Sequence, residues 1–119
     1  MNNILDRRPD LLVSGINHGS NSGVSVIYSG TMGAVFEGLI QGIPSVGFSL
    51  CNHDHNADFS ICQPLIVSLC QGILEKGLPQ GIGLNVNFPA VSELKGAHVC
   101  RAARGLWTEE YDRRIDPAG

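Results

Sequence analysis

The stretch LLVSGINHGSNSGVSVIYSGTMGAVFEG, residues 11–38, decides how the rest of the chain is interpreted. The apolar run at 10–14 predicts a strand covered on both faces, and the Gly-, Asn- and Ser-rich residues 15–23 predict a loop. Regular structure resumes near Thr31, where a helical pattern begins. A strand that leads through small polar residues into a helix is typical of anion sites in open α/β sheets.

The residues after this stretch continue an alternation of helices and strands. The helix from Thr31 should end at Gly42, and 45–50 reads as the next strand, so the two strands should be parallel. We expect four further elements: the end of a helix at 1–8, a helix at 57–76, and strands at 82–88 and 97–101. Pro64 should lie in the first turn of the 57–76 helix or kink it. In the strand at 82–88, Asn85 and Asn87 should share one face.

Composition limits the class of protein. With 119 residues, 43% of them hydrophobic and 16% charged, the chain can form a core and is not disordered. Its apolar runs are too short to span a membrane, and no signal peptide is visible, which favours the cytoplasm. The net charge of −3 argues against a nucleic acid as partner. The four cysteines lack C-x-x-C spacing, so we expect reduced, structural thiols.

Ser29, Gly30 and Thr31 form the first candidate site, at the start of the predicted helix. Exposed N–H groups and the positive end of the helix favour a phosphate, and the two hydroxyl groups add donors. The alternative is that Ser29 or Thr31 only caps the helix.

Asn17 is the second candidate, because it follows a buried strand and should lie at its carboxyl end. Its amide could bind a hard divalent cation or a phosphate, or it could only shape the loop. The acidic, His-containing loop 51–58 superficially resembles a metal cluster, but its spacing favours a solvated loop. Trp107 and Tyr111 could stack on a base or serve in packing.

Several motifs together resemble the survival protein E (SurE) family of metal-dependent 5′/3′-nucleotidases. They are SGINHGSNSG at 14–23, YSGT at 28–31, EG at 37–38, GIPSVGFSL at 42–50, NVNFP at 85–89 and DPAG at 116–119. The resemblance implies a Rossmann-like three-layer α/β/α fold with a mostly parallel central sheet. It also implies phosphoric monoester hydrolysis of a nucleoside monophosphate with Mg²⁺ or Mn²⁺, in a homo-oligomer (dimer or tetramer).

The same resemblance assigns roles to five residues. Asn17 would be a metal ligand and, with Ser29, catalytic; Asn21, Ser29, Gly30 and Thr31 would bind the phosphate. Three features of the family have no match here. They are the Asn-Asp-Asp-Gly strand that carries the aspartate pair, the serine ligand, and the C-terminal segment. We therefore expect residues 1–119 to be one partial domain, incomplete at both ends, that hydrolyses little by itself. Alternatives are a non-catalytic phosphate- or nucleotide-binding module and a nonfunctional truncation.

Overall fold

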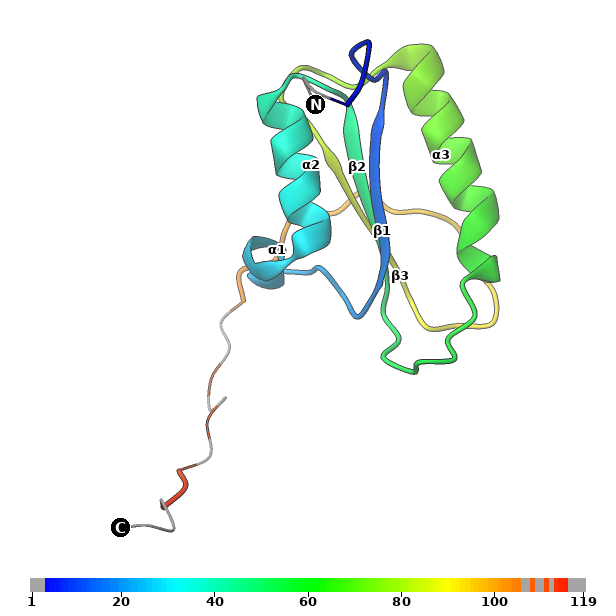
Figure 1. Cartoon of the computed structure of the whole chain (residues 1–119). Coiled ribbons are helices and arrows are strands. Elements are labelled where there is room, and N and C mark those ends of the chain that lie inside the picture. The colour runs from blue at the N-terminus through cyan, green and yellow to red at the C-terminus, as the bar shows by residue number, and fades with distance from the viewer. Residues whose placement is uncertain (1–3, 106–107, 109–110, 112, 116–119) are drawn as a thin grey trace.

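A computed structural model describes residues 4–105, 108, 111 and 113–115. The chain alternates strands and helices, with one short 3₁₀ turn (Figure 1). The elements are β1 Leu12–His18, α1 Ser25–Tyr28, α2 Gly30–Ile40, β2 Ser45–Leu50, the 3₁₀ turn η1 Ser60–Cys62, α3 Gln63–Lys76 and β3 Leu84–Phe88.

The three strands of the described part form one parallel sheet in the order β1-β2-β3. Strand β2 is central and buried along its whole length. The parallel pairing of β1 with β2 confirms the predicted βαβ unit, because α2 provides the crossover between them.

Helices α2 and α3 cover opposite faces of the sheet (Figure 1). Val46, Phe48 and Leu50 alternate on one face of β2 and form a core with Cys62 and Ile73 of the α3 side. On the other face, α2 approaches so closely that a Cβ on Gly47 would lie 3.0–3.2 Å from Met32, Val35 and Thr31. The predicted three-layer α/β/α arrangement is confirmed.

Strand β1 is longer than the sequence predicts. Residues 15–18, expected as loop, continue the strand, because Asn17 and His18 pair with Ser49 and Leu50 of β2. An irregularity between Ser14 and Asn17 shifts the register. Pairing with a buried neighbour outweighs the loop-like composition. The short helix α1 was not predicted.

Helix α3 begins at Gln63 and not at residue 57. Asp58 instead lies just before the separate turn η1, where its carboxylate accepts from the Ser60 N–H at 2.8 Å and from the Ser60 hydroxyl at 2.7 Å, as in an Asx turn. Pro64 lies in the first turn of α3, as expected. Strand β3 begins at Leu84, two residues later than predicted.

Two predicted elements are wrong. Residues 97–101 form no strand: Val99 is fully exposed, and a strand needs a partner for its backbone groups. Residues 4–8 form turns and bends, since so short a segment cannot sustain a helix alone; residues 1–3 and 116–119 lie outside the described part. No helix among the described residues is long and apolar enough to cross a membrane.

Candidate phosphate site at the carboxyl end of the sheet

Asn17 is the second-last residue of β1, at the carboxyl end of the sheet, and its amide has a defined orientation. Its Nδ2 donates to the carbonyl oxygens of His18 at 2.8 Å and Gly19 at 3.0 Å. Because these partners only accept, the opposite atom of the amide must be Oδ1. That oxygen accepts from Nδ2 of Asn21 at 2.9 Å, so two of the predicted site residues are in direct contact.

Strand β3 contributes the other half of this polar network. Asn87 Oδ1 accepts from Ser49 Oγ at 2.7 Å and from the Asn21 N–H at 2.8 Å. Asn85 Nδ2 donates to the Asn21 carbonyl at 2.7 Å. We call these five side chains the amide network: Asn17, Asn21, Ser49, Asn85 and Asn87. It joins the carboxyl ends of all three described strands.

Three members of the amide network were not among the predicted site residues: Ser49, Asn85 and Asn87. A signal for two of them was present, because the alternation in 82–88 places two asparagines together on one face of the predicted strand. Ser49 carried no such signal, since its importance depends on its pairing with Asn87 in the neighbouring strand.

Ser29 caps helix α2, which agrees with the alternative interpretation that this residue is an N-cap. Its Oγ accepts from the Met32 N–H at 3.1 Å, and its carbonyl accepts from the Gly33 N–H at 2.8 Å. The N–H groups of Gly30 and Thr31 precede the first intrahelical bond and point out of the helix start. Apart from its two chain neighbours and the backbone of its own helix, nothing lies within 4 Å of the position where Gly30 would carry a Cβ. The helix start is therefore open to a small anion.

The helix start and the amide network lie on the same side of the sheet. Thr31 is near Gly47, whereas Gly38, further along α2, is near Ser45, so the helix begins at the carboxyl end of β2. Ser49 is two residues from Gly47 and shares its face. Among the described residues, Ser29, Gly30 and Thr31 form no hydrogen bond with the amide network.

The loop 51–58 packs against the site without forming a metal cluster. The His53 ring lies over Gly19, where an added Cβ would be 2.5 Å from the ring. Asp54 Oδ1 accepts from the Asn56 N–H at 2.9 Å, as in an Asx turn. The Ser60 hydrogen bonds lower the pKa of Asp58 below its usual value. Across the described ranges, no three His, Cys, Asp or Glu side chains could together hold a metal ion.

Asn17 Oδ1 is an oxygen of the kind that Mg²⁺ and Mn²⁺ prefer, but it lacks companions. Asp10 lies beyond the amino end of β1 and forms an ion pair with Arg7 at 2.9 Å. The amide network offers no carboxylate. The residues described here therefore do not complete a divalent-cation site.

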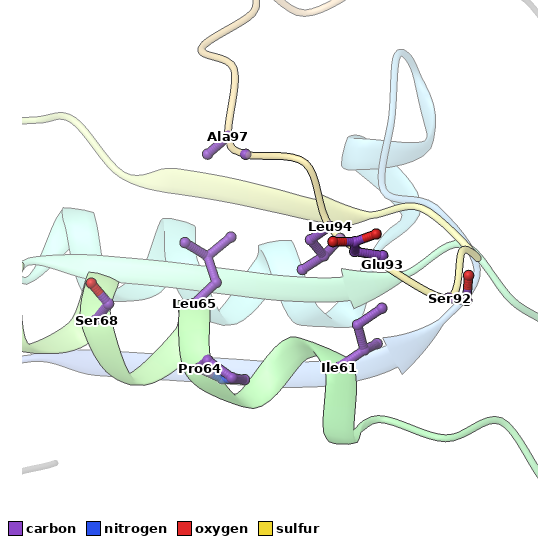
Figure 2. Close-up of a pocket in the computed structure, with 9 residues that line it drawn as sticks. Ile61, Pro64, Leu65, Ser68, Ser92, Glu93, Leu94 and Ala97 are labelled. Carbon is purple, nitrogen blue, oxygen red and sulfur yellow. The ribbon is translucent and has the colours of Figure 1, made fainter.

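An apolar pocket of about 540 Å³ lies on the other side of the sheet (Figure 2). Ile61, Pro64 and Leu65 of the α3 side face Leu94 and Ala97 of the segment that follows β3. It belongs to the α3 layer, whereas the amide network is on the α2 face. Tyr111 is 91% exposed, and Trp107 lies outside the described residues.

A family model described as "Survival protein SurE" matches residues 1–109. The chain belongs to the SurE family. A 5′-nucleotidase SurE from Phocaeicola vulgatus is 51% identical over 119 residues, which are 100% of this chain and 46% of that protein. The corresponding protein of Bacteroides thetaiotaomicron is 56% identical over 111 residues, covering 93% and 43%.

The SurE fold is also evident in a solved structure. The crystal structure of the SurE protein from Aquifex aeolicus superposes with a TM-score of 0.82 at 38% identity, over 96% of this chain and 46% of that one. The chain thus spans about half the length of the SurE relatives that it matches.

Proposed function

We propose that this chain is the phosphate-binding part of a nucleoside-monophosphate phosphatase of the SurE family. The observation that carries the proposal is that the open start of α2 lies on the same side of the sheet as an oriented pair of amides, Asn17 and Asn21, at the carboxyl end of the parallel strands. Parallel sheets bind ligands at this end, and helix starts favour phosphate. The relatives named 5′-nucleotidase support the class of substrate.

In this proposal, the N–H groups of Gly30 and Thr31 and the Thr31 hydroxyl hold the phosphate oxygens. Asn21 donates from the side of the amide network, and Ser29 keeps the helix start in shape through its cap. These donors are in place before the substrate arrives, so they stabilise the charge that develops on the phosphoryl oxygens without reorganisation. Water attacks phosphorus, the P–O bond to the nucleoside breaks, a proton from the water ends on the leaving nucleoside oxygen, and inorganic phosphate is released.

The proposed function includes a divalent cation, but the described residues do not supply a complete set of ligands for it. Mg²⁺ or Mn²⁺ would bind Asn17 Oδ1 as one ligand among several, and the remaining ligands would come from elsewhere. We therefore expect the chain alone to hydrolyse little. A homo-oligomeric state, as dimer or tetramer, and a cytoplasmic location belong to the same proposal.

A non-catalytic phosphate- or nucleotide-binding module is the second candidate. One observation favours it: the donors for a phosphate are present, while the amide network has no carboxylate for a cation. Such a module would bind AMP equally well with and without Mn²⁺, which calorimetry measures directly.

An assay of phosphate release from AMP, with and without Mn²⁺, tests the proposal. We expect Mn²⁺-dependent release by the full gene product, loss of release in its Asn17→Ala variant, and little release by residues 1–119 alone. An in-frame Asn-Asp-Asp-Gly sequence upstream of Met1 would supply the missing carboxylates. Release by residues 1–119 at the rate of an intact SurE protein would contradict the incomplete site. Absence of release by the full product would contradict the phosphatase.

A further inference from the structure

Two side chains of β3 hold both backbone hydrogen-bonding groups of Asn21. Asn87 Oδ1 accepts from its N–H at 2.8 Å, and Asn85 Nδ2 donates to its carbonyl at 2.7 Å. Asn21 lies in an irregular segment between β1 and α1, so neither a strand nor a helix satisfies these groups. The two side chains of β3 thus replace the neighbouring strand that a sheet would provide.

We propose that Asn85 and Asn87 are positioning residues that fix Asn21, and through it Asn17, at the candidate phosphate site. The identity of the ligand at this site rests on the proposed function, whereas the hydrogen bonds among these side chains do not depend on it. Residues 85 and 87 are two apart in a strand and project from the same face, so one strand can hold both ends of a single residue.

The clamp formed by Asn85 and Asn87 is itself anchored to the middle of the sheet. The buried Ser49 hydroxyl of β2 donates to Asn87 Oδ1 at 2.7 Å, and Asn87 Nδ2 donates to Asn85 Oδ1 at 3.0 Å. The two lone pairs of Asn87 Oδ1 are therefore occupied by Ser49 and Asn21, and the Ser20 hydroxyl makes a longer contact of 3.3 Å. The Ser49 hydroxyl, the Asn21 N–H and the Asn87 Nδ2 thus each donate to a defined oxygen within the clamp.

The clamp extends to Asn17, the proposed metal ligand, through a single further hydrogen bond. Asn21 is only 5% exposed, and its Nδ2 donates to Asn17 Oδ1 at 2.9 Å. Since the two Nδ2 hydrogens of Asn17 are directed to carbonyl oxygens, the orientation of both amides follows. Loss of the clamp should therefore free the backbone of Asn21 directly. The orientation of the Asn17 amide should become less fixed as a consequence.

Hydrogen exchange of the Asn21 amide tests the positioning without any ligand. We expect Asn87→Ala to accelerate this exchange about tenfold, the factor for losing one hydrogen bond. Asn87→Asp keeps an oxygen that accepts from the Asn21 N–H, so it should restore protection. Asn52→Ala is the matched control. It removes a similar hydrogen bond from the adjacent loop, in which Asn52 Oδ1 accepts from the Asp54 N–H at 2.9 Å. The Phe48 amide in the core reports whether each variant remains folded.

AMP binding, measured by calorimetry, and the kinetics of the full gene product test the functional half. We expect Asn87→Ala and Asn85→Ala to weaken AMP binding and raise KM about tenfold, with Asn52→Ala unchanged. The inference is overturned if Asn87→Ala matches Asn52→Ala in Asn21 exchange, or if it binds AMP as tightly as the wild type. If the wild type neither binds nor hydrolyses AMP while Asn87→Ala still accelerates exchange, the proposed function fails and the clamp on Asn21 stands.

Discussion

Gly15 shows at the scale of one residue why β1 can carry Asn17 to the edge of the site. Its φ is +106°, a backbone conformation that L side chains rarely adopt, and a Cβ there would overlap the Phe48 carbonyl oxygen of β2. The contact is with backbone, which cannot move aside without disturbing the central strand. Gly15 lies within the register shift that precedes Asn17, so a side chain here would displace the site residue.

We expect Gly15→Ala to lower the free energy of unfolding by about 3 kcal/mol, from backbone strain and overpacking together. Gly81→Ala is the matched control, because Gly81 also has a positive φ, +75°, but nothing lies within 4 Å of its added Cβ. That variant should lose about 1 kcal/mol from strain alone. Urea unfolding of both variants gives the comparison. Equal losses would show that the Phe48 contact is unimportant.

Ser29 has two separable roles at the scale of the α2 element. Its hydroxyl caps the helix through the Met32 N–H, and its position places it beside the proposed phosphate. Ser29→Ala should remove the cap and lower the free energy of unfolding by about 1 kcal/mol. Ser29→Asp should keep the cap, because aspartate is an equally good capping residue, while its charge repels a phosphate.

Urea unfolding and AMP calorimetry separate these roles. We expect Ser29→Asp to unfold like the wild type but to bind AMP at least about tenfold more weakly, and Ser29→Ala to lose stability with a smaller effect on binding. Wild-type AMP affinity in Ser29→Asp would place the phosphate elsewhere.

The elements that sequence patterns predicted best are those whose partners lie nearby in the chain. Helix α2 and strand β2 have clear apolar spacing, and a turn at Gly42 and Pro44 separates them. The extension of β1 could not be read from its Gly- and Asn-rich residues, because only pairing with β2 makes it a strand. Residues 97–101 show the reverse, since an apolar pattern alone did not produce a strand.

At the scale of the whole molecule, the candidate site depends on contacts between distant parts of the chain. Asn17 and the start of α2 could be identified from local motifs and the family resemblance, and Asn17 and Asn21 indeed touch. Their roles as catalytic, metal-binding or phosphate-binding residues, like the single partial domain at 1–119, stay predictions. The clamp on Asn21 by Asn85 and Asn87 could not be predicted, because it joins segments more than 60 residues apart.

The open N–H groups at the start of α2 are the proposed binding site for the phosphate of the substrate. Gly30 is the first residue of that helix, and Ser29 before it is extended, with φ −82° and ψ 121°. A proline is tolerated at such a position after an extended residue, and it replaces the N–H with the Cδ of its ring. Gly30→Ala is the matched variant, because it adds a methyl group in open space and keeps the N–H.

The most direct measurement is therefore kcat/KM for AMP in the full gene product carrying Gly30→Pro or Gly30→Ala, with urea unfolding to confirm that both fold alike. We predict that Gly30→Pro falls at least about tenfold below Gly30→Ala, because a hydrogen bond to a charged group contributes about 1.5–3 kcal/mol. Equal kcat/KM values in two folded variants would contradict a phosphate site at the start of α2.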